Sequence, residues 1–293
     1  MGPANTYVII TPAHNEEAFI EKTIVSVIKQ TVLPSKWIIV SDASTDRTDE
    51  IVNSYIAKNS WMKFVRKDDR SGSNFSSIVD TFNIGYLHLH DVSYDFIGKL
   101  DADIQLPVYY YETILNKFRE NPKLGVAEGK AIEYYENKSR QHVYKKNGVG
   151  SIHVFRRECF EAIGGYFDTK EGGEDTIAEA VARMKGWETK TFCDIYAYHL
   201  KPTNIVAGNP IQRQWQLGRR EYFCGNRPLF EVAKCCFKIT ARPYVIGAIA
   251  RLSAYLYLWF SRTQRDLPGN VIRFIWQEQL NRLIPFLNLL RNR

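Results

Sequence analysis

The chain has 293 residues, of which 45% are apolar and 13% aromatic, so it holds enough core-forming residues for one large domain with an appendage and is too apolar to be disordered. Its net charge of +7 is unevenly spread, because residues 1–200 carry 24 basic and 28 acidic side chains while residues 201–293 carry 15 and 4. The five cysteines lack disulfide-framework or metal-site spacing, which excludes a small secreted scaffold, and we expect no signal peptide before Tyr7.

Apolar periodicity predicts alternating strands and helices over the first hundred residues. Strands are expected at 7–11, 37–40, 63–65 and 95–100, and helices at 19–28, 51–56 and 76–89. Strand and helix in alternation build a parallel sheet with right-handed crossovers. We therefore predict an α/β fold in which a Rossmann-like, mostly parallel central sheet is flanked by helices.

The pattern is looser after residue 103. A helix is expected at 109–118, strand-like segments at 125–132 and 149–155, and a further helix at 175–185. After His199 the composition becomes rich in arginine and aromatic residues. We therefore place the catalytic, nucleotide-binding domain at 1–200 and a basic, aromatic-rich helical extension at 201–293.

Polar residues follow three of the predicted strands. The first strand ends in T-P-A-H-N-E at 11–16, the second in Ser41-Asp42, and the fourth in D-A-D at 101–103. Ligands of open parallel sheets bind at this edge, and two aspartates near each other suit a hard cation such as Mg²⁺ or Mn²⁺. No glycine-rich phosphate loop follows the first strand, which argues against a dinucleotide enzyme or a P-loop NTPase. An isolated D-x-D is more often a solvated turn, but its place after an apolar strand favours a site.

Four motifs in order, T-P-A-H-N-E-E, V-S-D-A-S-T-D-R-T, K-L-D-A-D and G-G-E-D-T, resemble those of glycosyltransferase family 2, the inverting enzymes of GT-A fold. The resemblance spans about residues 5–200. It implies a nucleotide-sugar donor with UDP, GDP or dTDP, a divalent cation (Mg²⁺ or Mn²⁺), and transfer with inversion at the anomeric carbon.

Matching residue by residue, the resemblance assigns nucleotide-sugar contacts to Thr11, Pro12, Ala13, His14, Glu16, Asp42, Asp101 and Ala102. His14 stands where relatives commonly have tyrosine, and an ordinary loop histidine is an equal alternative. Asp46 is better explained as a helix cap. Relatives often have a lysine or arginine before the D-x-D, whereas residues 71–94 have none. Arg70, Arg66 or Lys99 would have to replace it.

The remaining assignments concern the metal and the chemistry. The resemblance gives the cation to Asp101, Asp103 and His199, and the general base to Asp175, with Glu174 orienting the acceptor. Helix capping is the alternative explanation of the last two. Arg219 and Arg220 are candidates to close over the diphosphate. The motif Q-x-x-R-W of processive enzymes is absent, so we expect a non-processive enzyme.

The extension holds two apolar segments. Residues 243–260 would form a helix of roughly 27 Å, marginal for spanning a bilayer, and the central Arg251 would cost about 2.5 to 3.5 kcal/mol there. Residues 271–290 are amphipathic, with Pro285 expected to break or kink them. We predict an interfacial element at an anionic membrane surface; packing on the catalytic domain or a dimer interface is the alternative. No nucleic acid partner is expected, because the basic residues alternate with apolar ones.

The resulting hypothesis is a metal-dependent, inverting glycosyltransferase, peripheral on the cytosolic face of the cell membrane. It would add one sugar to a lipid-linked or polysaccharide acceptor in cell-envelope biosynthesis. A sugar nucleotidyltransferase is one alternative, although it would need a glycine- and lysine-rich loop after the first strand. A catalytically silent GT-A-like scaffold or glycan-binding subunit is another. The sequence leaves the oligomeric state open.

Overall fold

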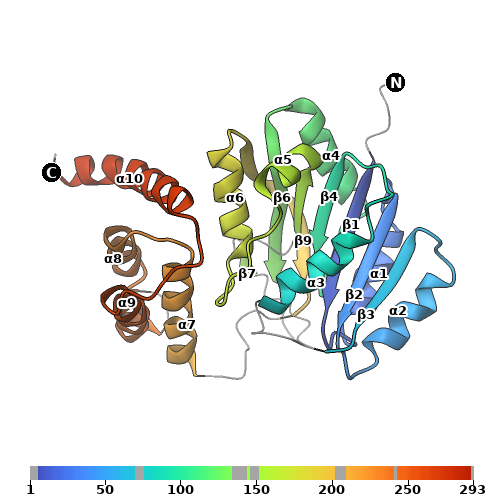
Figure 1. Ribbon diagram of the computed structural model, residues 1–293, viewed down its shortest axis with the longest axis horizontal. Coiled ribbons are helices and arrows are strands. Elements are labelled where there is room, and N and C mark those ends of the chain that lie inside the picture. Colours follow the sequence, from blue (N-terminus) through green and yellow to red (C-terminus); the bar gives the residue numbers. More distant parts are fainter. Residues whose placement is uncertain are drawn as a thin grey trace.

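A computed structural model describes residues 6–69, 76–133, 144–145, 152–201, 209–240 and 243–291 (Figure 1). A twisted sheet with helices on both faces forms the larger part of the molecule, and four helices from the last third of the chain pack beside it. Arg70, one of the basic residues considered for the nucleotide, lies outside the described residues.

The first half of the sheet is parallel, as predicted. Its four strands are β1 (Tyr7–Ala13), β2 (Lys36–Asp42), β3 (Met62–Lys67) and β4 (Phe96–Leu100), in the order β3-β2-β1-β4. They are connected through the helices α1 (Ile20–Ile28), α2 (Thr48–Ile56) and α3 (Ser76–Leu87). Because the strands are short apolar runs between polar turns, sequence periodicity located each of them within two residues.

The second half of the sheet is mixed. It contains β5 (Ile104–Gln105), β6 (Leu124–Glu133), β7 (Tyr144–Lys145), β8 (Ile152–Arg156) and β9 (Glu188–His199), and the order continues from β4 as β8-β6-β9-β5. Strand β8 is antiparallel to both β4 and β6. The predicted α/β class with flanking helices is confirmed, while the parallel arrangement is interrupted where β8 enters the sheet.

Two hydrophobic cores lie on opposite faces of the sheet. Helices α1, α2 and α4 (Tyr110–Glu120) cover one face, where Trp37 and Tyr111 are fully buried. Helices α3, α5 (Arg157–Ile163) and α6 (Glu174–Met184) cover the other. Alternate residues of β1 serve the two cores, Ile9 on one side and Ile10 on the other, as the two-residue repeat of a strand requires.

The helical extension consists of α7 (Pro210–Phe223), α8 (Pro228–Phe237), α9 (Tyr244–Phe260) and α10 (Gly269–Arg291). Val271 and Ile275 of α10 join the core that contains α6, so the extension is packed on the catalytic domain. The expected break at Pro285 is wrong, since the helix continues through it to Arg291. In the parts of the chain that the structure describes, no helix combines the length and apolarity needed to cross a bilayer.

The charge at the centre of the apolar helix α9 is that of Arg251, which pairs with two buried glutamates. Its side chain is 3% exposed and lies 3.0 Å from Oε1 of Glu231, with a second ion pair to Glu221. Helices α7 and α9 approach closely at Gly218, where an added Cβ would stand 2.1 Å from the carbonyl oxygen of Arg251. One face of α9 is therefore a packing face, and the helices it packs against, α7 and α8, belong to the extension itself.

Candidate active site

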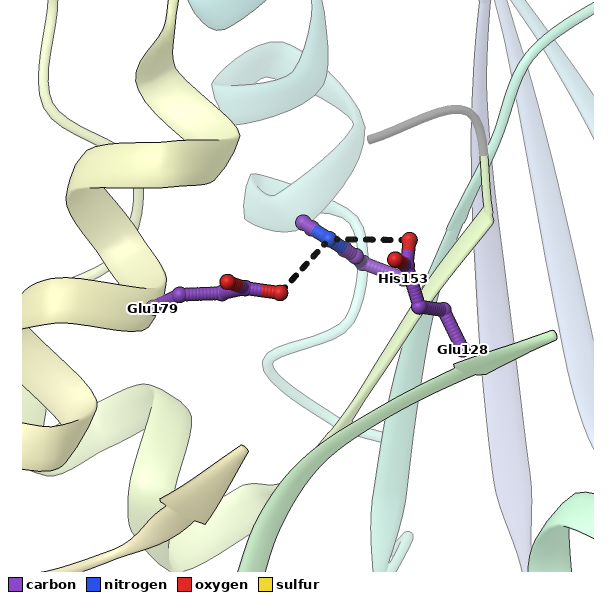
Figure 2. A group of neighbouring side chains, drawn as sticks. All are labelled: Glu128, His153 and Glu179. Atoms are coloured by element: carbon purple, nitrogen blue, oxygen red, sulfur yellow. Dashed lines mark ion pairs between the residues drawn. The ribbon is translucent and has the colours of Figure 1, made fainter. Parts of the chain in front are cut away.

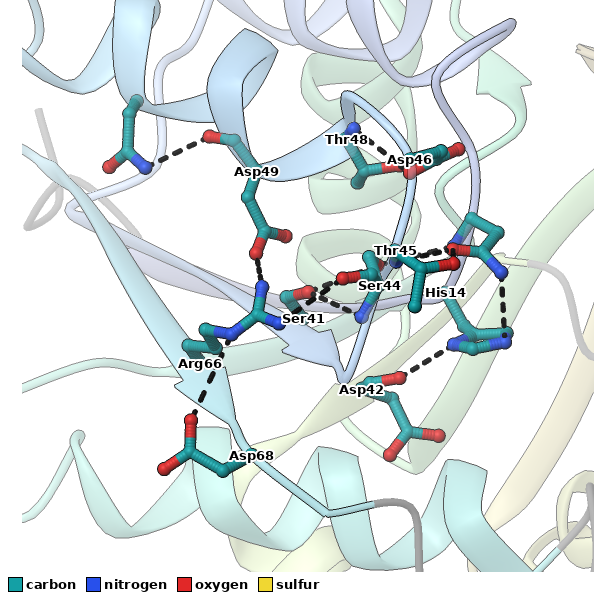
Figure 3. Close-up of polar contacts among 12 residues, drawn as sticks. His14, Ser41, Asp42, Ser44, Thr45, Asp46, Thr48, Asp49, Arg66 and Asp68 are labelled. Carbon is teal, nitrogen blue, oxygen red and sulfur yellow. Dashed lines mark hydrogen bonds and ion pairs between the residues drawn. The ribbon is translucent and has the colours of Figure 1, made fainter.

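The turns after β1 and β2 lie side by side at the carboxyl edge of the sheet (Figure 3). His14 contacts the backbone carbonyl of Asp42 through Nδ1 at 2.6 Å, and since a carbonyl only accepts, His14 donates. Thr11 is buried and accepts a hydrogen bond from Nε1 of Trp37 at 2.9 Å, while Ala13 is also buried. Thr11 is thus a buried support of the turn after β1. The half-buried His14 ring lies beside Asp42 in the same turn region.

Asp42 is held by a lysine that sequence reasoning did not select. Lys67, the last residue of β3, lies opposite Asp42 in the β2–β3 register, and its Nζ is 3.1 Å from Oδ1 of Asp42. The Ser77 hydroxyl donates to the other carboxylate oxygen. Arg66 instead pairs with Asp49 and donates to the carbonyl of Ser44 at 3.2 Å (Figure 3). The basic residue beside Asp42 is therefore Lys67.

Asp46 supports the start of α2, as expected of a capping residue. Its Oδ1 accepts hydrogen bonds from the backbone N–H of Thr48 at 3.0 Å and from the Thr48 hydroxyl at 2.6 Å. Its Oδ2 accepts from the N–H of Glu17 at 3.0 Å, which ties the two turns together. These bonds hold the pKa of Asp46 below its usual value even though partial burial opposes them.

Asp103 and His199 are neighbours because β5 begins directly after Asp103 and pairs with the end of β9, with Ile104 opposite His199. The His199 Nε2 atom is 3.6 Å from Oδ2 of Asp103, and both side chains are largely buried. The His199 Nδ1 atom bonds the carbonyl of Lys201. Because a carbonyl only accepts, Nδ1 donates in that bond, and Nε2 is the ring nitrogen that faces Asp103.

Two further carboxylates, Asp101 and Glu16, lie near this pair. Burial raises the pKa of Asp103 to about 7, with Asp101 and Glu16 adding to the shift and His199 and Lys201 opposing it. Burial also raises the pKa of Glu16, even though Lys201 Nζ lies 2.7 Å from its Oε1. The second Glu16 oxygen, Oε2, is buried without a hydrogen-bond partner. Oxygen ligands with excess negative charge, and one of them unsatisfied, fit a hard divalent cation.

The turn before α6 brings Glu174 and Asp175 to the same region. Gly172 and Gly173 have φ angles of +78° and +94°, which allow the chain to turn into the helix. Lys99, 4% exposed, lies 3.3 Å from Oε1 of Glu174 and 3.6 Å from Oδ1 of Asp101. Lys99 therefore joins the D-x-D turn to the first residue of α6.

The two adjacent carboxylates have opposite proton affinities. Burial alone would raise the pKa of Glu174, but Lys99 and backbone N–H groups outweigh it and the pKa is lowered. Burial raises the pKa of Asp175, and the charge of Glu174 adds to that shift. Neighbouring carboxyls whose pKa values diverge are typical of sites in which one is a fixed anion and the other exchanges a proton.

Arg219 and Arg220 lie on α7 beside the loop that precedes Glu174. The Arg219 guanidinium pairs with Glu171 at 2.6 Å. The Arg220 Cγ and Cδ atoms would be 3.7 and 3.8 Å from a Cβ on Gly173. The structure thus places both arginines at the turn into α6, with Arg219 held by Glu171.

A second polar cluster lies inside the domain and was not found from the sequence (Figure 2). The Nε2 atom of His153 is 3.3 Å from Glu128 and 3.6 Å from Glu179, and His153 is fully buried. Among the described residues this is the only trio of His, Cys, Asp or Glu whose ligand atoms all lie within 4.8 Å of one another. The three residues come from distant parts of the chain and form no motif.

Comparisons with known proteins identify the family of the chain. The family model described as glycosyl transferase family 2 matches residues 8–173. The poly-beta-1,6-N-acetyl-D-glucosamine synthase of Staphylococcus epidermidis is 31% identical over 232 residues, covering 71% of this chain and 53% of the relative. The chondroitin synthase of Pasteurella multocida is 28% identical over 116 residues, covering 40% of this chain and 11% of the relative. The chain therefore spans only about half, or less, of these relatives.

Solved structures share the fold. The mannosyltransferase PcManGT from Pyrobaculum calidifontis, in complex with GDP-Man and Mn²⁺, aligns with a TM-score of 0.57 at 18% identity, covering 99% of this chain and 80% of that one. TarS 1-349 of S. aureus, in complex with UDP-GlcNAc, aligns with a TM-score of 0.54 at 18% identity, covering 88% and 74%. From the family model, the ordered motifs and this fold, we conclude that the chain is a glycosyltransferase of family 2 with a GT-A-like fold.

Proposed function

We propose that this enzyme moves one sugar from a nucleotide-sugar donor to a hydroxyl of a lipid-linked or glycan acceptor, with inversion, and that a divalent cation and the Asp175 carboxylate support the transfer. The observation that carries the proposal is the Lys99 bridge between Asp101 and Glu174. It joins the turn expected to hold the donor to the turn expected to hold the base, so that both ends of the reaction lie at one edge of the sheet.

The donor side is built from the strand exits. Asp42, fixed by Lys67, and His14 beside it would contact the nucleoside. Asp101, Asp103 and His199 would hold Mg²⁺ or Mn²⁺, with Glu16 close to them. When bound, such an ion stabilises negative charge on the leaving diphosphate. The similar structures are complexes with GDP-Man and UDP-GlcNAc, which makes GDP-sugars and UDP-sugars the first donors to test.

The acceptor side is the start of α6. An acceptor hydroxyl must lose its proton as the new bond forms, and a positioned carboxylate takes it. Asp175 suits this role because its pKa is raised by burial and by Glu174. Glu174 remains an anion fixed by Lys99, placed to orient the acceptor.

Donor binding and transfer can be measured separately. Calorimetry with UDP-GlcNAc, GDP-Man and a dTDP-sugar, each with and without Mn²⁺, should identify one tight, metal-dependent donor. The Asp103→Ala variant should lose the Mn²⁺-dependent part of binding, whereas Asp175→Asn should bind the donor as the parent does and transfer no sugar. Failure of every donor to bind the folded parent with Mn²⁺ present would contradict the proposal.

We also propose that the outer face of α8 and α9 rests on the cytosolic surface of an anionic membrane. Phe237, Ile246, Ile249, Tyr257 and Phe260 are all at least 58% exposed there. Lys238 and Arg262 are exposed nearby. The four acidic residues of the extension, Glu221, Glu231, Asp266 and Glu278, are all engaged in ion pairs, with Arg251, Lys234, Lys170 or Arg183. An apolar face with basic neighbours suits a negatively charged leaflet.

Co-sedimentation with phosphatidylglycerol-containing vesicles tests this surface. The parent should bind these vesicles more tightly than pure phosphatidylcholine vesicles, and added salt should weaken the binding. The Ile246→Asp, Ile249→Asp double variant should lose most of it, whereas Leu33→Asp, at an exposed apolar residue of the catalytic domain, should not. A parent that ignores vesicles and forms a dimer which the double variant disrupts would show that the face is a subunit interface instead.

A further inference from the structure

Two buried basic side chains, Lys99 and His153, lie next to each other on the sheet beside α6. Lys99 of β4 and His153 of β8 are directly opposite in the antiparallel register, so their side chains lie on the same face of the sheet. Both are buried, at 4% and 0% exposure. Lys99 holds Glu174, and the Nε2 atom of His153 is 3.6 Å from Glu179. Two neighbouring strands, β4 and β8, therefore hold α6 through ion pairs to Glu174 and Glu179, which are five residues apart.

Asp175 lies between these two points. Residues four apart share a helix face, so Glu179 follows Asp175 one turn along α6. Glu179 is also linked to the helical extension, because Arg183 contacts Glu179 at 3.5 Å and Glu278 of α10 at 2.7 Å. Displacement of the first turn of α6 would break buried ion pairs at Lys99 or His153.

His153 is fixed from the sheet side by Glu128 of β6. Its Nε2 atom is 3.3 Å from Glu128 (Figure 2). Glu128 in turn accepts a hydrogen bond from the Thr191 hydroxyl at 2.8 Å. Burial opposes protonation of His153, but Glu128 and Glu179 outweigh it and raise its pKa to about 10. At neutral pH the cluster therefore contains an imidazolium between two carboxylates.

Charged groups of three elements lie around this imidazolium: Glu128 on β6 and Glu179 on α6 contact it, Lys99 on β4 stands opposite it in the strand register, and Asp175 on α6 is affected by its charge. Among them, Asp175 responds to His153. Burial and Glu174 raise the pKa of Asp175, while the positive charges of His153 and Lys99 lower it. Removal of the imidazolium charge would therefore raise the pKa of Asp175 further.

We infer that His153 is a positioning residue for the transfer reaction: the Glu128–His153–Glu179 ion triad anchors the first turns of α6 to the sheet and sets both the place and the electrostatic environment of Asp175. This inference rests on the proposed role of Asp175 as the base. It assigns a function to three residues of β6, β8 and α6 that belong to none of the sequence motifs.

Two variants separate anchoring from charge. His153→Gln removes the imidazolium, and Glu179→Gln releases α6 while His153 keeps Glu128. Both should lower kcat, between about tenfold and a hundredfold, because small misplacements of a reacting group are costly. Donor affinity with Mn²⁺ should change little in either. Only His153→Gln should move the acid limb of the pH–rate profile upward, because only it removes positive charge near Asp175. Equal kcat losses without that shift would show that the cluster acts through structure alone.

Asp175→Asn is the reference that keeps this inference distinct from the proposed mechanism. If Asp175→Asn still transfers sugar, the assignment of the base is wrong. If it is inactive while His153→Gln retains the parental kcat and pH profile, the present inference is wrong. Circular dichroism and a thermal unfolding curve establish that each variant is folded. Should His153→Gln not fold, Glu179→Gln with an unchanged kcat would overturn the inference by itself.

The Glu128–His153–Glu179 cluster also has the residue types of a metal site, and one measurement tests whether it binds a metal ion. In the Asp103→Ala protein, dialysed against a chelator, elemental analysis should find no bound divalent ion. One equivalent retained there, and absent after His153→Gln is added, would mean that the trio ligates a metal. The ion-triad inference would then be overturned.

Discussion

Lys99 Nζ stands 3.3 Å from Glu174 Oε1 in a position that is 4% exposed, so a strand of the sheet and the first residue of α6 share one buried ion pair. Lys99→Met would leave Glu174 buried beside no cation. Breaking a buried pair in this way costs about 3 to 5 kcal/mol. We expect urea unfolding to show a loss of that size, together with loss of transfer.

The exposed Lys58→Met serves as the control for that variant, and its free energy of unfolding should stay within about 0.5 kcal/mol of the parent. A Lys99→Met protein as stable as the parent would mean that Glu174 is satisfied by water or by protonation, and that the bridge does not fix the start of α6.

A second buried ion pair holds the extension together. Arg251 contacts Glu221 and Glu231 on α7 and α8. We expect Arg251→Met to destabilise the packing of the extension by about 3 to 5 kcal/mol, because the fully buried Glu231 loses the arginine that it pairs with and Glu221 is left with Lys234. The triple variant Arg251→Met, Glu221→Gln, Glu231→Gln should recover part of the loss, and the exposed Arg262→Met should cause none. Limited proteolysis of the extension and urea unfolding both report the effect. Protection equal to the parent in Arg251→Met would contradict this account.

The parts that the sequence predicted share a physical property: they are local. Strands such as 37–40 are continuous apolar runs between polar turns, and a parallel sheet fixes where their ends meet. The register that pairs Asp42 with Lys67 depends on two strands at once, so the sequence pointed to the neighbouring Arg66, among others, and not to Lys67. The Arg251 pairs likewise needed the packing of α7 and α8 to become visible.

The remaining differences have the same origin. β5 contains only two residues, too few for any periodicity, and β9 begins with four consecutive polar residues and alternates between buried and exposed positions only over 195–199. His153 looked like an isolated residue in the sequence, since its partners Glu128 and Glu179 are more than 20 residues away on either side. Sequence patterns within one element carry no information on such contacts.

Gly218 sets the distance between α7 and α9. A Cβ there would be 2.1 Å from the Arg251 carbonyl oxygen, closer than any real contact, so Gly218→Ala must push the helices apart. We expect a loss of stability of about 1 to 3 kcal/mol. Gly269→Ala, where an added Cβ meets nothing within 4 Å, is the matched control and should leave stability almost unchanged. Equal unfolding midpoints for the two variants would show that the α7–α9 contact yields without cost.

The buried imidazolium predicts a pH dependence of stability with a definite sign. Burial lowers the proton affinity of His153, but Glu128 and Glu179 raise its pKa to about 10, above the value of about 6.5 expected in the unfolded chain. The folded state therefore binds the proton more tightly than the unfolded state. The resulting stabilisation is fully present below about pH 6.5 and is lost as the pH rises through about 10. Urea unfolding of the parent and of His153→Gln, repeated between pH 6 and 10, should show a stability difference that is largest at the acid end and shrinks steadily. A difference that stays constant, or grows with pH, would mean that His153 is neutral in the folded enzyme.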